Sequence, residues 1–421
     1  MPPQALLGEQ SPASLVGWAK PRPRSGRAVL DDSDAGGAPF RRECLGHEIL
    51  ARALAPDDRG RHRRQPSAES PGGFRGRRPP SRRSRDVSLF GARRHPRTAA
   101  LPVEGHLPGF DGATGWLNSS PLTPAELGGR VVLVDFWTYT CINWLRTLAF
   151  VRAWAAKYRD LGLVVIGVHT PEFPFERELE NVREAAQAMS VGHPIALDSD
   201  YGVWSAFANR YWPAVYLADA EGRIRYHHFG EGEYDEGEWM IQQLLREAAV
   251  EGIDNELVSV APDGFEAQAD WTNLRSPETY LGYAQGQNLD SPDGVAYDEP
   301  RSYVAPESLQ LNTWALAGNW TIEGRASVLN EAGGRIAFRF HARDVHLVMR
   351  SRAGTAVPFR VLVDGEAPGA AHGLDVEEEG RGTLVQPRLY QLVREPGSIT
   401  DRTFEIAFLD PGVEAYVFTF G

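Results

Sequence analysis

The hydrophobic and polar positions of the chain divide it into three regions with different patterns. Residues 1–100 are rich in Arg, Pro, Ser and Gly and show neither the two-residue period of a strand nor the 3.6-residue period of a helix. Residues 101–250 alternate apolar runs with amphipathic segments, whereas residues 265–421 contain short alternating runs between turns. The pattern predicts a disordered arm, an α/β domain and an all-β domain, in that order.

The middle region reads as alternating strands and helices. Its first apolar run, 131–137, and its second, 161–169, are nearly continuous, which is typical of buried strands in parallel sheets. The full set of predicted elements is strands at 131–137, 161–169, 214–217 and 224–229, and helices at 143–158, 176–189, 203–209 and 236–249. The turn at 219–222 indicates a hairpin between the last two strands, so we expect a mixed sheet between helices.

The last region contains runs with a two-residue period and no helical period. The predicted strands are 313–320, 335–340, 345–350, 359–363, 388–393, 403–408 and 415–419. Seven such strands between polar turns favour an antiparallel β-sandwich over residues 265–421. Trp314 and Trp320 lie an even number of residues apart in one run and therefore share a face, which favours the core for at least one of them.

Charge separates the first hundred residues from the rest of the chain. They carry 20 Lys and Arg against 10 Asp and Glu, whereas the remaining residues carry 24 against 46. An arginine-rich arm can contact phosphate groups. We favour a solvated tail or an over-extended translation start, and expect no nucleic-acid partner.

Several exclusions follow from apolar runs, cysteine counts and histidine spacing. No run of about 18 apolar residues occurs, so we expect no integral membrane segment, and no secretory signal is visible in the arm. The chain has two cysteines, Cys44 and Cys141, which are too few for a disulfide scaffold or an all-thiolate zinc site. The histidines have no metal-ligand spacing, and we expect neither a metal nor another cofactor.

Cys141 lies where the strand at 131–137 turns into the helix at 143–158. A thiol at the start of a helix faces unpaired backbone N–H groups and the positive end of the helix dipole, and both favour the thiolate. We therefore expect Cys141 to be more nucleophilic at neutral pH than an ordinary cysteine.

Several motifs around Cys141 resemble those of a known family. The segment Val134–Cys141, with Asp135 six residues before the cysteine, resembles the active-site strand of thioredoxin-like proteins, and Tyr211–Ala214 resembles their cis-proline loop. More narrowly, the motifs WTYTCIN, LRT, HTPEF and HFGEGEY resemble the TlpA-like thioredoxin region of DipZ-type proteins, which carry a C-terminal sandwich similar to a carbohydrate-binding module. The resemblance implies a thioredoxin fold over 101–250, with Pro213 and Trp212 beside the reactive sulfur, where they hold the substrate backbone. It also implies a location outside the cytoplasm, which conflicts with the absence of a visible signal.

The chain departs from the family at the second active-site cysteine. The family motif is Cys-x-x-Cys, but here Trp144 follows Cys141-Ile-Asn. A dithiol oxidoreductase needs the second sulfur to release its substrate. Cys44 could supply it only if the arm folded back over 97 residues, and nothing in the sequence holds it there. Trp144 shares the helix face of Cys141 and could shield the sulfur.

Three interpretations of the α/β domain remain open. In the first, it is a single-cysteine redox protein that acts on a protein or small-molecule disulfide with an external thiol reductant. In the second, it is a redox-inactive binding module. In the third, Cys141 is a buried structural residue. A peroxidase is a further alternative, because Thr138 stands three residues before Cys141, but Val134 replaces the proline that peroxiredoxins have.

The remaining candidates flank these motifs. Asp135 is either a proton acceptor or a buried, hydrogen-bonded carboxyl. Arg146 could stabilise a thiolate, although a solvent-facing arginine is the commoner outcome. Glu172 and Glu231 could act as proton relays, but solvated loop carboxylates are the default.

Aromatic residues of the sandwich are candidates for sugar binding. Tyr280 and Tyr283 lie in a turn-rich segment and are expected to be exposed, and Trp271 is a third candidate. Aromatic faces that stack on pyranose rings would make a glycan a possible partner of this domain.

Overall fold

The computed structural model describes residues 101–421 in full and the backbone of β1 (Glu43–Cys44). The predicted disordered arm at 1–100 therefore lies outside the described residues, except for these two. Within the described chain, no helix is both long enough and apolar enough to cross a membrane.

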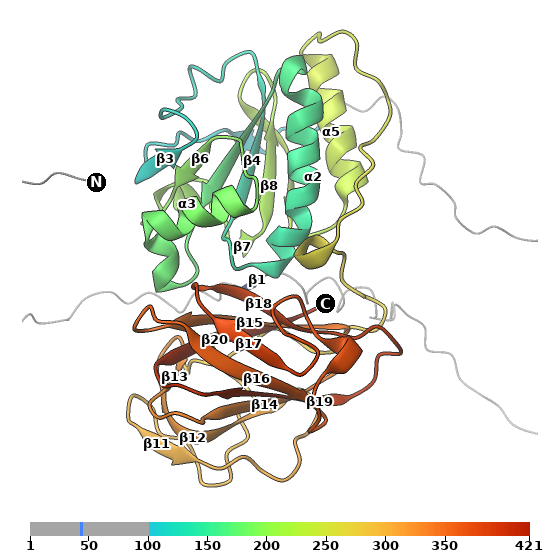
Figure 1. The fold of residues 1–421 in the computed structure, drawn as a ribbon. Coiled ribbons are helices and arrows are strands. Elements are labelled where there is room, and N and C mark those ends of the chain that lie inside the picture. Colours follow the sequence, from blue (N-terminus) through green and yellow to red (C-terminus); the bar gives the residue numbers. More distant parts are fainter. Residues whose placement is uncertain (1–42, 45–100) are drawn as a thin grey trace, which may run out of the picture. The chain divides into compact units, whose positions relative to one another are not determined.

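The middle region folds around a mixed sheet, as predicted, and this sheet has seven strands where the pattern predicted four (Figure 1). The strand order is β2-β9-β8-β4-β5-β6-β3, in which β4, β5 and β6 are parallel and the remaining pairs are antiparallel. The strands are β2 (Gly105–His106), β3 (Gly115–Leu117), β4 (Val131–Trp137), β5 (Leu163–His169), β6 (Ile195–Leu197), β8 (Ala214–Ala218) and β9 (Arg223–Phe229). Every residue of β4 is buried, because this strand is central and covered on both faces.

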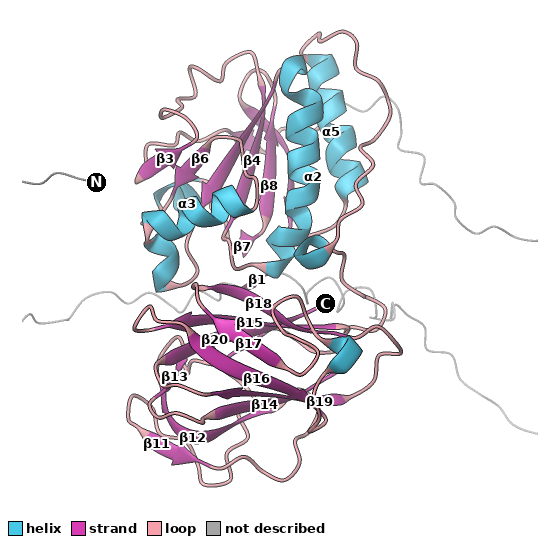
Figure 2. Ribbon diagram, in the orientation of Figure 1, coloured by secondary structure: helices cyan, strands magenta, loops and turns pink. Residues whose placement is uncertain are grey.

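Helices cover both faces of this sheet (Figure 2). They are α2 (Ile142–Tyr158), α3 (Leu179–Ala188), α4 (Gly202–Ala206) and α5 (Tyr234–Glu247). One face of β4 packs with α2 and α5, through Leu133, Trp154 and Leu244 among others. The other face packs with α3 and α4 and with the first turns of α2. This arrangement is the thioredoxin fold, and it places the start of α2 at the carboxyl end of β4.

The observed elements of this region differ from the predicted ones in one divided helix and in several short strands. The helix predicted at 176–189 is divided into a 3-10 turn, Pro174–Arg177, and α3, because Glu178 adopts an extended conformation with φ −74° and ψ 116°. The pattern did not reveal β2, β3, β6 or β7 (Tyr211–Trp212), since two or three residues are too few to show a period.

The C-terminal region is a curled antiparallel sheet that closes over its own core. The order is β17-β16-β19-β14-β12-β13-β20-β15-β18, with β10 on β20 and β11 on β12. The strands are β10 (Thr279–Tyr280), β11 (Arg301–Tyr303), β12 (Trp314–Ile322), β13 (Ser327–Leu329), β14 (Arg335–Phe340), β15 (Asp344–Ser351), β16 (Val357–Val363), β17 (Arg381–Leu384), β18 (Arg388–Arg394), β19 (Arg402–Phe408) and β20 (Val413–Phe420). All seven predicted strands are present, and the predicted antiparallel sandwich is confirmed.

The long strand β12 joins the two layers of the sandwich. Its first half pairs with β14 and its second half with β13 and β11. Both Trp314 and Trp320 are buried in the core between the layers, which confirms the prediction from their spacing. Each contributes a large apolar surface to this core.

A two-strand pairing lies beside the thioredoxin sheet. β1 pairs in parallel with β7, so that Glu43 is in register with Tyr211 and Cys44 with Trp212. The sequence showed nothing that would hold Cys44 near this domain, whereas the structure pairs its backbone with that of Trp212.

Candidate active site

Cys141 is the N-cap residue of α2. Its backbone is extended, with φ −78° and ψ 111°, and its carbonyl accepts the N–H of Leu145 at 3.0 Å, which opens the helix. Its own N–H donates to the carbonyl of Thr138 at 3.2 Å and closes the preceding turn. The sulfur therefore lies at the positive end of a 17-residue helix, as the sequence predicted.

The sulfur of Cys141 faces the loop that the sequence singled out. Its Sγ lies 3.9 Å from the carbonyl oxygen of Trp212, and the Trp212–Pro213 peptide bond is cis. Trp212 is itself buried and packs on Trp204, with ring centroids 4.4 Å apart. Cys141 is only 3% exposed, so a disulfide that reaches its sulfur must enter between buried neighbours.

Trp144 occupies the place of the second cysteine and makes two specific contacts. Its indole Nε1 donates to Oδ2 of Asp135 at 2.9 Å. Its ring stacks on Trp137, with centroids 4.3 Å apart. Asp135 is fully buried, and this desolvation raises its pKa to about 7, although the Trp144 hydrogen bond partly lowers it. Of the two alternatives for Asp135, the geometry is that of a buried carboxyl held by a hydrogen bond.

Arg146 is buried, contrary to the expectation of a solvent-facing residue. Its Nη1 donates to Oε1 of Glu231 at 2.9 Å, and the two side chains are 1% and 3% exposed. Its Nη2 donates to the carbonyl of Phe420 in the last strand of the sandwich at 3.4 Å. The default of a solvated carboxylate is therefore wrong for Glu231, because it lies opposite a buried guanidinium. Burial raises the pKa of Glu231, and Arg146 partly offsets this.

Glu172 also differs from a solvated loop carboxylate. The hydroxyl of Tyr280 donates to its carboxylate, and Arg325 donates to its backbone carbonyl at 2.8 Å. Desolvation and the neighbouring Glu176 raise the pKa of Glu172 to about 8. The contact also explains why Tyr280, expected to be exposed, is buried: β10 pairs with β20, and the tyrosine packs into the core that contains Cys141.

Glu176 is a buried group next to the cysteine that the sequence did not reveal. It accepts hydrogen bonds from the Thr140 hydroxyl at 2.6 Å and from the backbone N–H groups of Glu172 and Phe173 at 2.6 and 2.8 Å. It thereby ties the residue before Cys141 to the loop after β5. The only sequence signal was its position after Pro174, where a carboxylate can accept the free N–H groups that open a helix.

The other two sandwich candidates lie away from this cluster. Tyr283 is 43% exposed, as expected, and its ring packs against Tyr297, which is 57% exposed, with centroids 4.9 Å apart. Trp271 is partly buried and packs against the sandwich core. Over the described part of the chain, no group of three His, Cys, Asp or Glu side chains could hold a metal ion.

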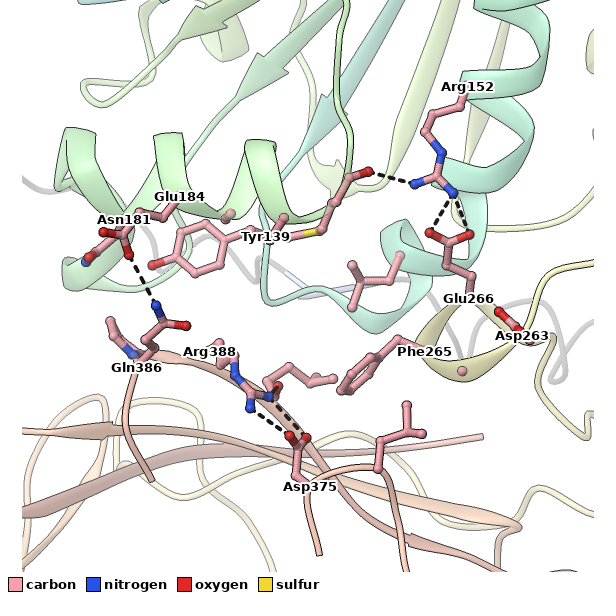
Figure 3. Close-up of a pocket in the computed structure, with 18 residues that line it drawn as sticks. Tyr139, Arg152, Asn181, Glu184, Asp263, Phe265, Glu266, Asp375, Gln386 and Arg388 are labelled. Atoms are coloured by element: carbon pink, nitrogen blue, oxygen red, sulfur yellow. Dashed lines mark hydrogen bonds and ion pairs between the residues drawn. The ribbon is translucent and has the colours of Figure 1, made fainter. Parts of the chain in front are cut away.

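A cavity of about 620 Å³ opens near the start of α2 (Figure 3). Tyr139 and Leu145, on either side of Cys141 in the sequence, contribute to its wall. Four of the charged groups around it form two ion pairs, Arg152 with Glu266 at 2.7 Å and Arg388 with Asp375 at 2.6 Å. Residues of the thioredoxin domain and of the sandwich therefore line one pocket.

Comparison with known proteins matches both halves of the chain. Residues 276–421 match the model of the family described as "Thioredoxin like C-terminal domain". Protein DipZ of Mycobacterium bovis is 39% identical over 255 residues, which are 60% of this chain and 36% of that protein. The chain thus covers little more than a third of the length of this relative.

A second relative is covered over most of its length. The thiol–disulfide oxidoreductase YkuV of Bacillus subtilis is 31% identical over 126 residues, which are 30% of this chain and 83% of YkuV. Among solved structures, the solution structure of a thioredoxin-like protein in the oxidized form is 29% identical, with a TM-score of 0.32, and the match covers 34% of this chain and 96% of that one.

Proposed function

The chain belongs to the TlpA/DipZ-type family of thioredoxin-like thiol–disulfide oxidoreductases, and from this premise we propose that Cys141 is its reacting group. Membership implies a disulfide substrate and a thiol reductant. The observation that carries the proposal is the position of the sulfur, at the N-cap of α2 and 3.9 Å from the Trp212 carbonyl of the cis-proline loop. Backbone N–H groups at a helix start stabilise a thiolate, which is the attacking form.

The proposed reaction begins with nucleophilic attack. The Cys141 thiolate attacks one sulfur of a substrate disulfide, forms a mixed disulfide with it and expels the other sulfur as a thiolate, which takes a proton from water. In the usual dithiol cycle the cysteine three residues later would then attack Cys141. Trp144 has no thiol and cannot do so, and its indole donates a hydrogen bond to Asp135. The second thiol must therefore come from elsewhere, and in the simplest scheme it is an external thiol.

Pro213 and Trp212 are the proposed substrate-holding residues. The Trp212 carbonyl lies beside the sulfur, where it can accept an N–H from an extended substrate when β1 is not paired with this edge. Arg146 and Glu231 take no direct part in this scheme. Their buried ion pair holds the first turns of α2 against the segment after β9, and so positions the helix that carries Cys141.

Alkylation of Cys141 tests the proposal. The full chain and the Cys141→Ser variant would be labelled with iodoacetamide over a range of pH, and the modified peptide quantified by mass spectrometry. We expect the labelling rate of Cys141 to reach half its maximum below pH 8.5, which is about the value for an ordinary thiol. Failure of the folded protein to label at this residue would refute the proposal.

A second candidate function is a redox-inactive binding protein. It is favoured by the 3% exposure of Cys141 and by the exposed pair Tyr283 and Tyr297 on the sandwich. Adjacent exposed aromatic rings can stack on sugar faces. A glycan array with the wild type and the Tyr283→Ala variant tests this: binding at millimolar affinity or better that is lost in the variant supports it, and no binding by the wild type contradicts it.

A further inference from the structure

Both cysteines of the chain lie next to the same residue, Trp212. Cys44 is paired with Trp212 in register, in the parallel pairing of β1 with β7. Cys141 places its Sγ 3.9 Å from the Trp212 carbonyl oxygen. Two residues that are 97 positions apart in the sequence therefore meet at the loop that ends in the cis peptide bond. The chain contains no third cysteine.

The β1–β7 pairing places the backbone of Cys44 beside Trp212, the residue whose carbonyl lies next to the sulfur of Cys141. Paired strands lie about 4.8 Å apart, so the backbone of Cys44 is one strand spacing from that of Trp212. The sulfur of Cys141 lies at that same residue. A disulfide between the two cysteines would require their Cα atoms to lie about 4.4–6.8 Å apart.

The pairing has the form of a bound peptide. Peptides that add a strand to an exposed edge are held by backbone hydrogen bonds, and this holds one of their residues opposite a chosen position of the edge. Here the added strand is Glu43–Cys44 of the same chain, and the edge is Tyr211–Trp212. The residue held opposite Trp212 is a cysteine, and a second cysteine is what the Cys-x-x-Trp motif lacks at its last position.

We propose that Cys44 is the resolving cysteine of Cys141. This inference rests on the proposed function, since it starts from the mixed disulfide on Cys141. The Cys44 thiolate attacks Sγ of Cys141, a Cys44–Cys141 bond forms, and the bond from Cys141 to the substrate sulfur breaks. The substrate sulfur leaves as a thiolate and takes a proton from water. The substrate disulfide has gained two electrons, the chain has lost two, and an external dithiol reduces the Cys44–Cys141 bond again.

The experiment is a single turnover of the full, reduced chain with one equivalent of 5,5′-dithiobis(2-nitrobenzoate). Released thionitrobenzoate is measured by absorbance, and the protein by intact mass and by non-reducing peptide mapping. The variants are Cys44→Ser and Cys141→Ser, with Glu43→Ser as the control in the same strand. We expect the wild type and Glu43→Ser to release about two thiolates per chain, to carry no adduct and to yield a peptide that links Cys44 with Cys141.

The variants separate this inference from the proposed function. Cys44→Ser is expected to release about one thiolate and to retain the adduct on Cys141. If the wild type instead retains the adduct on Cys141 as Cys44→Ser does, and a small external thiol removes it equally well from both, Cys44 is not the resolving residue although Cys141 is reactive. If neither protein reacts at Cys141, the proposed function fails as well.

Discussion

The indole Nε1 of Trp144 donates a hydrogen bond to the buried carboxyl of Asp135 at 2.9 Å. Trp144, which stands in place of the second active-site cysteine, thus donates a hydrogen bond to the carboxyl that the sequence offered as a proton acceptor. With tryptophan at position 144, Asp135 is buried and one of its two carboxyl oxygens accepts a hydrogen bond. The same tryptophan also fills the space behind the start of α2 with an indole stacked on Trp137.

Trp144→Phe separates the hydrogen bond from the packing. Phenylalanine retains an aromatic ring against Trp137 but leaves Asp135 without its donor. A buried polar group that loses its partner costs about 1–3 kcal/mol. We expect the free energy of unfolding to fall by about that amount, measured by urea denaturation at pH 7. A variant as stable as the wild type would show that the hydrogen bond contributes nothing.

Asp135→Asn should change how stability depends on pH. The pKa of Asp135 in the folded chain is about 7, above its ordinary value of 3.8. The folded state therefore holds the proton more tightly, and this contribution is complete below about pH 4 and is lost as the pH rises through 7. The difference corresponds to about 4 kcal/mol at about 1.4 kcal/mol per pH unit.

The measurement is unfolding by urea between pH 4.5 and 8.5 for both proteins. Asparagine cannot ionise but can still accept the Trp144 hydrogen bond, so the stability of Asp135→Asn relative to the wild type should increase toward high pH. Parallel curves for the two proteins would mean that Asp135 ionises in the folded chain as readily as in the unfolded chain.

The sequence predicted those parts of the fold that depend on local pattern. The apolar run of β4, the helix that follows it and the position of Cys141 between them could all be found from neighbouring residues. The cis peptide before Pro213 followed from resemblance and not from the pattern. Short strands such as β6 escaped detection because three residues contain no period.

The burial of charged site residues could not be predicted, because their partners are distant in sequence. Arg146 and Glu231 are 85 residues apart, and Tyr280 lies 108 residues from Glu172. Each looks like a surface residue in its own segment. The packing of α2 against the segment after β9 brings Arg146 to Glu231. The pairing of β10 with β20 holds Tyr280 where its hydroxyl reaches Glu172.

Removing one partner of the buried ion pair of Arg146 and Glu231 should lower the free energy of unfolding more than removing both charges. Arg146→Met leaves a buried carboxylate without its guanidinium and should lower the free energy of unfolding at pH 7 by about 3–5 kcal/mol. Adding Glu231→Gln should recover part of this loss, because the isolated charge is then removed. Arg159→Met, at an exposed arginine, is the control and should change stability by less than about 0.5 kcal/mol. Equal losses in the single and double variants would refute the argument.

Trp144→Cys should restore a second thiol at the position where the family has it. The variant is made in the Cys44→Ser background, so that Cys44 cannot contribute to the turnover. Cysteine at 144 would attack the mixed disulfide on Cys141 from one helical turn away. We expect turnover of a small disulfide with excess dithiol to rise at least about tenfold over Cys44→Ser alone. Removing the indole costs about 3–5 kcal/mol of stability. Trp144→Ser in the same background creates a similar cavity without a thiol, so equal turnover by the serine and cysteine variants would show that position 144 does not lie where a resolving sulfur must be.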